Sequence, residues 1–369
     1  MIIIEGLYNK AKVFTSDLEP TAREQIKTLC DQPFVKGSKI RIMPDVHAGA
    51  GCPIGTTMTI TDRVVPNLVG VDIGCGMHTL QLEEDQLDYP KLDRLIKSEI
   101  PSGFAIRKTP HHFMKKIDLT KLRCRENGKN DQKLNLERAR LSLGTLGGGN
   151  HFIEVNQNEK GQLYFVIHSG SRNIGLQVAL HYQRKASQLN PQQPRDLAYL
   201  EGKLMEDYLH DMKIMQKFAR FNRKAMADII VDGMNWKVED TFITIHNYID
   251  LEQMMLRKGA ISAAKNEKVL IPLNMRDGSL ICIGKGNPDW NESAPHGAGR
   301  IMSRTQARKE LSLKEFHQSM AGIYTSSVRR GTLDESPMAY KPIDHLLEYL
   351  DQTAEILHHV KPTYNFKAS

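Results

Sequence analysis

The chain has 369 residues, of which 40% are hydrophobic and 25% charged, and its formal net charge is +7. These proportions are typical of a soluble globular protein, and no apolar run is long enough to span a bilayer. The first apolar run, residues 2–4, is too short for a signal peptide, so we expect a cytoplasmic protein. The positive charge favours a polyanionic partner such as nucleic acid, although a basic enzyme of another kind fits the charge equally well.

Short apolar segments separated by glycines predict strands along the first 85 residues and again further on. The clearest of these are residues 1–4, 40–43, 57–60, 163–167 and 241–245. Residues 126–133 are polar and predict an exposed loop, followed by a helix near 134–143. The irregular alternation of strand and helix patterns predicts a mixed α/β (α+β) fold, with residues 1–369 as one domain.

Two further helices are predicted from apolar residues that recur every three or four positions. The first covers about 194–230, and its apolar stripe predicts a core-facing helix. A row of cations, Lys213, Lys217, Arg220 and Lys224, follows another face of that helix. The row is either a solvated face or a track for an RNA backbone. The second helix is predicted over 342–360, followed by an irregular end, 361–369.

The five cysteines are scattered and odd in number, so they do not predict a disulfide framework. Five glycine-rich loops instead carry the residues capable of chemistry, and each loop follows an apolar run. They cover residues 43–55, 71–77, 147–154, 168–172 and 293–300. Because glycine lets a backbone turn sharply and approach a ligand closely, such loops suit binding and catalysis.

Five side chains at these loops or at strand ends are candidate metal ligands. A thiolate, a carboxylate and imidazoles together suit a transition metal of intermediate softness. Each residue alone has an ordinary explanation, since a single histidine or cysteine is usually structural. The recurrence at four separate junctions favours a metal site, with enough ligands for two ions if the thiolate bridges: Asp72, Cys75, His151, His168 and His246.

Two other loops contain candidates for phosphate chemistry. Arg172, after two serines and a glycine, could bind a phosphate, although a plain turn is an equal alternative. His296 lies between proline and small residues, which leave its ring accessible. An imidazole can attack phosphorus as a nucleophile, whereas the ordinary alternative is an exposed loop histidine.

At these motifs the sequence resembles the RtcB family of RNA-splicing and repair ligases. The matching segments are MPDVHAGAGCPIG, GVDIGCGM, GTLGGGNHFIEV, HSGSRNIG, SAPHGAGRIMSR and SPMAYKPID, in the family's order between residues 43 and 344. The resemblance implies a mixed α/β fold around a two-manganese site. It also implies GTP-dependent joining of an RNA 3′-phosphate or 2′,3′-cyclic phosphate to a 5′-hydroxyl, through a guanylylated histidine.

The resemblance also assigns residues to roles. It implies that His296 carries the guanylate, that Asp45 supports the hydrolytic or ligation step, and that all five candidate ligands hold manganese, with Cys75 bridging. The residues implied to contact the nucleotide or its phosphates are Asn150, Glu154, Arg172, His296, Gly297, Ala298, Gly299 and Lys367.

One segment departs from the family pattern. Many members have Pro-Gly-Ser-Met-Gly-Thr where this chain reads PLNMRDG at 272–278, a segment close to the nucleotide in the family. The resemblance therefore does not extend to the GTP contacts that this segment makes in the family. Two alternatives to a ligase remain: a metal-dependent phosphoesterase that only opens cyclic phosphates, and an RNA-end-binding protein without catalysis.

Overall fold

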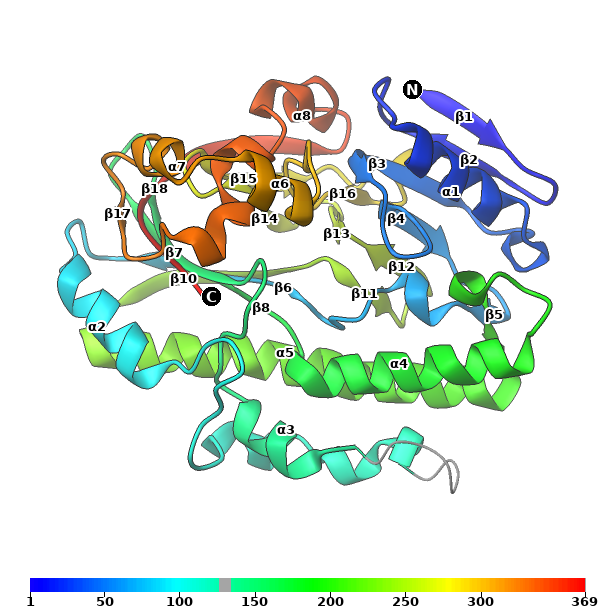
Figure 1. Ribbon diagram of the computed structural model, residues 1–369, viewed down its shortest axis with the longest axis horizontal. Coiled ribbons are helices and arrows are strands. Elements are labelled where there is room, and N and C mark those ends of the chain that lie inside the picture. Colours follow the sequence, from blue (N-terminus) through cyan, green and yellow to red (C-terminus); the bar gives the residue numbers. More distant parts are fainter. Residues whose placement is uncertain (126–133, 369) are drawn as a thin grey trace.

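Two β-sheets and two long helices organise the protein, whose computed structural model describes residues 1–125 and 134–368 (Figure 1). The first sheet has six strands, and it joins the N-terminal region to a hairpin from much later in the chain. Its strands, in spatial order, are β1 (Ile2–Glu5), β2 (Lys10–Val13), β3 (Ile40–His47), β4 (Ile54–Thr59), β12 (Met255–Lys258) and β11 (Asn247–Asp250).

The second sheet has eight strands and carries most of the predicted site residues at its strand ends. Its path runs β10 (Val238–Ile245), β6 (Gly76–Leu82), β8 (Leu163–Ser169), β7 (Phe152–Gln157), β18 (Ala354–Lys367), β15 (Gly278–Gly284) and β14 (Lys268–Asn274). The short strand β17 (Tyr324–Thr325) pairs with β18 in parallel, whereas the strands along the path pair antiparallel. Two short pairs lie outside both sheets: β5 (Arg63–Val64) with β9 (Leu200–Glu201), and β13 (Ala260–Ser262) with β16 (Ser293–Pro295).

Two long helices, α4 (Arg172–Leu189) and α5 (Gly202–Met234), lie side by side under the sheets, with α3 (Leu136–Ser142) beyond them (Figure 1). The predicted apolar stripe of α5 is buried, including Tyr208, Met212 and Met215, so its assignment to the core is confirmed. Among the described residues no helix combines the length and the apolarity needed to cross a membrane. The remaining α-helices are α1 (Pro20–Cys30), α2 (Tyr89–Glu99), α6 (Arg304–Glu310), α7 (Leu313–Ser319) and α8 (Ile343–Leu350).

The structure confirms the mixed α/β fold class and the strands predicted from apolar runs, which overlap β1, β3, β4, β8 and β10 to within one residue at the ends of the predicted ranges. The helix predicted near 134–143 is α3. All five cysteines are buried, and none of them forms a disulfide with another. The loop predicted at 126–133 lies outside the described residues.

The helix predicted from residue 194 begins later than its apolar spacing suggests. Residues 195–197 form a 3₁₀ turn and Leu200 lies in β9, so α5 starts only at Gly202 and extends to Met234. Leu197 and Leu200 are buried in the same core as the helix, which explains why their spacing extended the helical pattern. All four members of the cationic row are exposed on α5; their contact with RNA stays a prediction.

The prediction for residues 342–369 is wrong in its second half. Helix α8 ends at Leu350, and residues 354–367 form β18, which lies between β7 and β15 in the middle of the large sheet. The apolar residues from Leu346 to Val360 happen to fit a helical period. Tyr364 and Phe366, two positions apart, are buried in one core cluster as the strand period requires, and pairing with two neighbours decides the outcome. Pro362 is accommodated at a register shift in the ladder.

The buried position of Tyr364 in β18 gives a test of this corrected assignment. Its side chain is fully buried, and its hydroxyl donates to Asp93 Oδ1 on α2 over 3.1 Å. We expect Tyr364→Ala to lower the free energy of unfolding by about 3–5 kcal/mol, because it leaves a cavity under α2. Tyr364→Phe keeps the ring and should cost only about 1–2 kcal/mol. Urea unfolding of both variants measures the difference; a negligible effect of the alanine would contradict a central strand.

Candidate active site

The five predicted metal ligands meet at one edge of the large sheet. Asp72 and Cys75 lie in the loop before β6, His151 directly precedes β7, His168 lies near the end of β8, and His246 follows β10. Because these neighbouring strands run antiparallel, the starts of β6 and β7 lie beside the ends of β8 and β10. Strand pairing therefore brings together residues that are far apart in the sequence.

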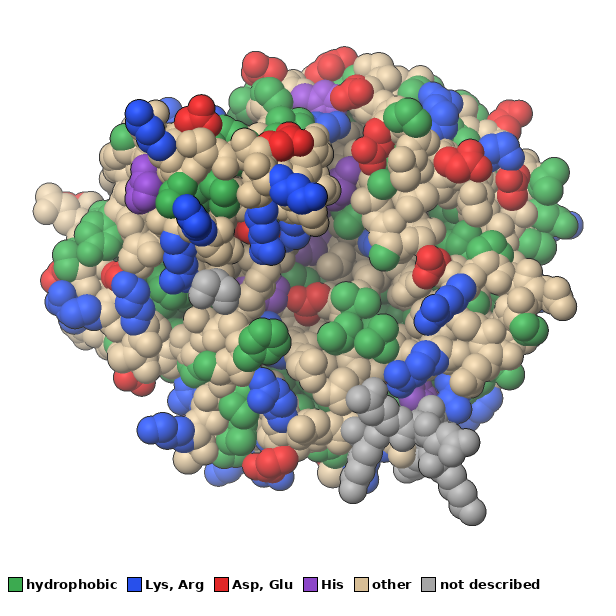
Figure 2. Space-filling model, viewed as in Figure 1, with side chains coloured by type: hydrophobic (Ala, Val, Ile, Leu, Met, Phe, Trp, Pro, Cys, Tyr) green, Lys and Arg blue, Asp and Glu red, His purple; other side chains and the backbone are tan. Residues whose placement is uncertain are grey.

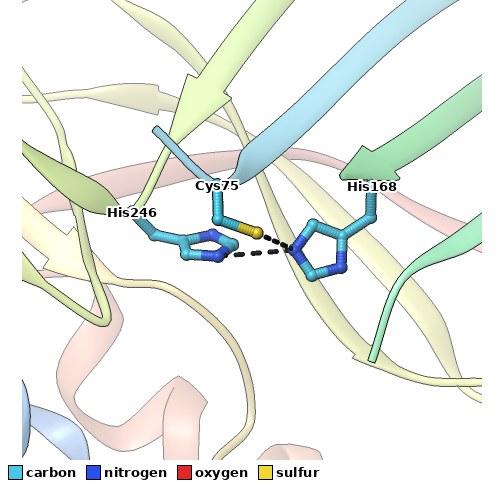
Figure 3. A group of neighbouring side chains, drawn as sticks. All are labelled: Cys75, His168 and His246. Atoms are coloured by element: carbon cyan, nitrogen blue, oxygen red, sulfur yellow. Dashed lines mark hydrogen bonds between the residues drawn. The ribbon is translucent and has the colours of Figure 1, made fainter. Parts of the chain in front are cut away.

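Cys75 is the centre of this cluster. Its Sγ lies 3.3 Å from His168 Nε2 and 3.5 Å from His151 Nε2. His168 Nε2 is in turn 3.3 Å from His246 Nε2, and His151 Nε2 is 3.0 Å from Asp72 Oδ2 (Figure 3 shows Cys75, His168 and His246). Two overlapping triads of potential ligands result, and Cys75 belongs to both. Cys75 therefore lies where two groups of potential metal ligands meet.

Backbone carbonyls orient two of the histidine rings toward the thiol. His151 Nδ1 lies 2.8 Å from the carbonyl oxygen of Leu146, and His168 Nδ1 lies 3.1 Å from that of Asn150. A proton on Nδ1 satisfies each carbonyl and leaves the Nε2 lone pair facing Cys75. Such fixing of the tautomer by the second nitrogen is the usual arrangement for histidine ligands of metals.

The loop after β8 holds the carboxylate of Asp72. Its Oδ1 accepts a hydrogen bond from the backbone N–H of Ser171 over 3.0 Å. This approach requires glycine at position 170, because a Cβ there would lie only 2.1 Å from the same oxygen. The glycine of the HSGSR motif thus has a steric role: it makes room for a ligand from another loop.

Burial sets the protonation of the cluster. It lowers the pKa of His168 and of His246 well below the usual range, which keeps the imidazoles neutral and able to bind a cation. Burial, assisted by Asp72, raises the pKa of the Cys75 thiol well above its usual value. A cation would be needed to stabilise the thiolate here. The donor set of one thiol, three imidazoles and one carboxylate fits a divalent transition metal.

Helix α5 supports the ligand loops through two buried polar residues that the sequence analysis missed. Arg223 Nη1 donates to the carbonyl oxygens of Gly74 and Ser169, each over 2.7 Å. Asn222 donates to the carbonyl of Gly170 over 3.1 Å and accepts from the backbone N–H groups of Gly144 and Thr145, which precede the loop that carries His151. The available signal was a polar pair inside an otherwise apolar helical face.

His296 lies next to the cluster with its ring fixed by Asp45. Its Nδ1 is 2.6 Å from Asp45 Oδ2, and its backbone N–H donates to the same oxygen over 3.1 Å. The Asp45 side chain is fully buried, whereas that of His296 is 22% exposed. The centroid of the His296 ring lies 5.2 Å from that of His246. An Nδ1–H bonded to a carboxylate leaves Nε2 unprotonated, which is the form a nucleophile requires.

A cavity of about 250 Å³ opens beside His296 and the metal cluster. Seven of the eight residues predicted to contact the nucleotide line it, together with His168 and His246: Asn150, Glu154, His296, Gly297, Ala298, Gly299 and Lys367. The departing segment 272–278 forms part of its wall. Arg172 is the exception among the predicted nucleotide residues. It lies on a second cavity with Asp72 and His151, while Asn150 borders both cavities.

The cavity is also lined by an ionic group of Glu335, Arg304 and Lys367, of which the sequence predicted only Lys367. The buried carboxylate of Glu335 pairs with Lys367 and with Arg304, whose Nη1 lies 2.7 Å from Glu335 Oε1. The hydroxyl of Tyr340, in the SPMAYKPID motif, donates to Glu335 Oε2 over 3.0 Å. Glu335 and Arg304 show no distinctive local spacing, so only the folded chain reveals this group.

Glu154 is a buried acid in the same cavity. Burial raises the pKa of its carboxyl from 4.5 to about 7, even though the hydrogen bond from Asn365 and the charge of Lys367 act in the opposite direction. The Glu154 Oε2 atom accepts from Asn365 Nδ2 over 2.6 Å. The carboxyl group can therefore exist in either protonation state near neutral pH.

These observations define a candidate metalloenzyme: a thiol–imidazole–carboxylate cluster beside a carboxylate-oriented histidine in a polar cavity. Comparison with known families agrees with this class. The family model described as tRNA-splicing ligase RtcB matches residues 25–368. The chain belongs to the RtcB family.

Named relatives come from bacteria and archaea. The chain is 33% identical over 387 residues to the RNA-splicing ligase RtcB of Escherichia coli K12, covering 92% of each chain. It is 30% identical to the tRNA-splicing ligase RtcB of Pyrobaculum aerophilum, over 84% of this chain and 83% of the relative. The corresponding protein of Aeropyrum pernix is 29% identical, with 92% and 90% covered. The similarity thus extends over nearly the whole chain.

Because Cys75 belongs to both groups of potential ligands, its removal tests the metal cluster. We expect Cys75→Ala to weaken Mn²⁺ binding more than about 100-fold, since loss even of groups that orient ligands typically costs 10–100-fold. Cys282→Ala is the matched control, because Cys282 is also fully buried but lies in a separate core. Calorimetric titration of the metal-free protein compares the variants. Equal affinities for wild type and Cys75→Ala would refute a thiolate ligand.

Glu154 gives a prediction for stability against pH. In the unfolded chain its carboxyl ionises near pH 4.5, whereas in the folded protein it stays protonated until about pH 7. The unfolded state therefore binds fewer protons in this window, and Glu154 reduces stability as pH rises through it. Glu154→Gln should remove this loss, so its stability relative to wild type should increase from pH 4 to pH 8 by on the order of 3 kcal/mol. Denaturant titrations across this range, without nucleotide, measure it; a constant difference would show an ordinary pKa.

Proposed function

We propose that this protein is an RNA ligase that joins 3′-phosphate or 2′,3′-cyclic phosphate ends to 5′-hydroxyl ends and consumes GTP. The observation that carries the proposal is the pairing of His296 Nδ1 with buried Asp45, beside the cluster of Cys75, His168 and His246. A ligase of this kind needs a nucleophile for the nucleotide and strong positive charge for two phosphates. His296 would supply the nucleophile, and cations held by the cluster would supply the charge.

His296 would act as the nucleophile through Nε2. That atom forms a bond to the α-phosphorus of GTP while the bond to pyrophosphate breaks. An oxygen of the RNA 3′-phosphate then attacks the same phosphorus, and the bond to His296 breaks. The 5′-hydroxyl oxygen finally attacks the RNA phosphorus and displaces GMP. Asp45 keeps the imidazole in the required orientation and tautomer and stabilises the positive charge that the ring acquires.

The cavity wall would hold the guanylate. Asn150 and Glu154 border the cavity, and Gly297, Ala298 and Gly299 let the backbone approach the phosphate. Lys367 would read the guanine base with a donor for its O6 oxygen, a role supported by its place beside Glu335 in the same cavity. The departing segment 272–278 contributes other wall atoms without removing the cavity.

The metal ligands would be Asp72, Cys75, His151, His168 and His246, with Cys75 bridging, and we propose manganese as the active ion. Bound divalent cations polarise phosphoryl oxygens and neutralise the leaving pyrophosphate. Arg172, on the second cavity, would bind a phosphate of the RNA. We further propose that residues 1–369 act as one domain, because the C-terminal strand lies within the main sheet. We also propose that the protein acts in the cytoplasm.

A cyclic phosphoesterase or a non-catalytic RNA-end-binding protein is not favoured. Either function would need the metal cluster or a phosphate-binding arginine. Neither would need His296, an imidazole that is fixed by a buried carboxylate and lines a cavity. The complete set of nucleophile, orienting acid and ligands is the reason to prefer ligation.

Radiolabelled GTP with Mn²⁺ tests the nucleophile. The label in the α-phosphate should remain on the protein in a denaturing gel, and His296→Ala should abolish this adduct while Mn²⁺ binding persists. His358→Ala is the control, because His358 pairs with Glu159 at the surface and should leave the adduct intact. A second arm compares RNA ends. Substrates with 3′-phosphate and 5′-hydroxyl ends should be joined, whereas those with 3′-hydroxyl and 5′-phosphate ends should not. The adduct surviving in His296→Ala, or joining of only the second pair of ends, would overturn the proposal.

A further inference from the structure

A second cavity of about 640 Å³ reaches the metal cluster from another direction. Asp72 and His151 of the cluster border it, and Asn150 belongs to both cavities. Figure 2 shows that this face of the molecule is hollowed near its centre, with histidine and acidic side chains visible in the hollow. A substrate in the second cavity would therefore approach the cluster without occupying the space beside His296.

Phe104 is the most exposed large hydrophobic residue on the described surface, at 94%, and it lies on this cavity. A single exposed apolar side chain needs no explanation in itself. Here, however, the ring borders the same cavity as two metal ligands and two arginines, Arg138 and Arg172. This combination of an aromatic face, cations and a metal cluster is what a nucleotide requires: a surface for the base and charge for the phosphate.

The backbone around Phe104 is tied down, so the ring is presented from a fixed position. Gly103 N–H donates to the carbonyl of Gly147 over 2.8 Å, next to the glycine motif that carries His151. Arg138 Nη2 donates to the carbonyl oxygen of Phe104 itself over 2.6 Å. Because ordering a flexible loop costs affinity, a preformed platform binds a base more tightly than a mobile one.

The arginines of the cavity are held by neutral groups. Arg172 Nε donates to the hydroxyl of Thr145 over 3.1 Å, and its guanidinium lies directly over Gly147, where a Cβ would approach Nη1 to 1.8 Å. Arg138 donates to a backbone carbonyl. These hydrogen bonds to neutral oxygens orient the two guanidiniums, and the charge of nearby Asp72 also acts on Arg172. Guanidiniums held in this way can bind an anionic ligand.

We propose that Phe104 is a stacking platform for the base of the 3′-terminal nucleotide of the RNA, whose phosphate lies toward Arg172 and the metal cluster. The proposal rests on the proposed ligase function and names the substrate subsite. The 3′ end is preferred over the 5′ end because its terminal phosphate is a dianion that requires cations, whereas a 5′-hydroxyl end carries no terminal charge. Stacking on an aromatic face is tolerant of sequence, since every base has such a face.

Kinetics with RNA separates this role from the rest of the reaction. Phe104→Ala should raise KM for a 3′-phosphate RNA about tenfold, the range typical of one lost base stack, and leave the covalent GMP adduct at wild-type level. Phe104→Trp should restore KM. Tyr8→Ala removes an exposed aromatic ring that borders neither cavity and should behave as wild type. An unchanged KM in Phe104→Ala would overturn the proposal while leaving the ligase function in place.

A substrate lacking the 3′-terminal base shows whether the ring contacts that base. With wild-type enzyme, the abasic RNA should raise KM by about as much as Phe104→Ala raises it with normal RNA. Abasic RNA with the Phe104→Ala variant should show no further increase in KM. Fully additive losses would overturn the stacking contact. A fluorescence titration with RNA that carries 2-aminopurine at its 3′ terminus tests the contact without catalysis. The wild-type protein should quench the fluorescence of 2-aminopurine, and Phe104→Ala should not. If wild type forms no GMP adduct, the ligase function fails, yet the same quenching still decides whether Phe104 stacks on the base.

Discussion

The hydrogen bonds from Arg223 to two carbonyl oxygens are the interaction on which the site depends most. They join helix α5 to the loop that carries Cys75 and to the end of β8 beside His168. A guanidinium with no exposed surface is costly to bury. Here two backbone carbonyls accept from Nη1, whereas Nε and Nη2 are buried without a hydrogen-bond partner among the described residues. The same residue places positive charge close to the thiol. Stability of the fold and geometry of the cluster are therefore linked through one side chain.

Two cavities border the cluster of potential metal ligands. Asn150 lies between them, and the ligands divide accordingly, with His168 and His246 on the side of His296 and Asp72 and His151 on the side of Arg172. A reaction that transfers a nucleotide to an RNA end must hold two polyanions close together without letting them compete for one space. Two cavities that border one cluster of potential metal ligands would meet that requirement of the proposed reaction.

Much of the site could be predicted from the sequence because its elements are local. A glycine-rich loop after an apolar strand is visible as a pattern, and Cys75, His168 and His296 each lie in such a segment. Their convergence required the antiparallel order of β10, β6, β8 and β7, which no local spacing encodes. The C-terminal error has the same origin. The period of residues 346–360 fits a helix, and only pairing with β7 and β15 makes 354–367 a strand that brings Lys367 into the cavity.

The segment 272–278, where the chain departs from its family pattern, shows how such a change can be absorbed. It forms the end of β14 and the turn into β15, and Asn274 Oδ1 accepts from the backbone N–H groups of Arg276 and Asp277 over 3.0 and 2.9 Å. These hydrogen bonds from the backbone to the Asn274 side chain stabilise the turn. Met275 is buried against Phe316 in a small separate core. The turn therefore has its own hydrogen bonds and packing, and the departing segment lines the cavity proposed for the nucleotide with different side chains.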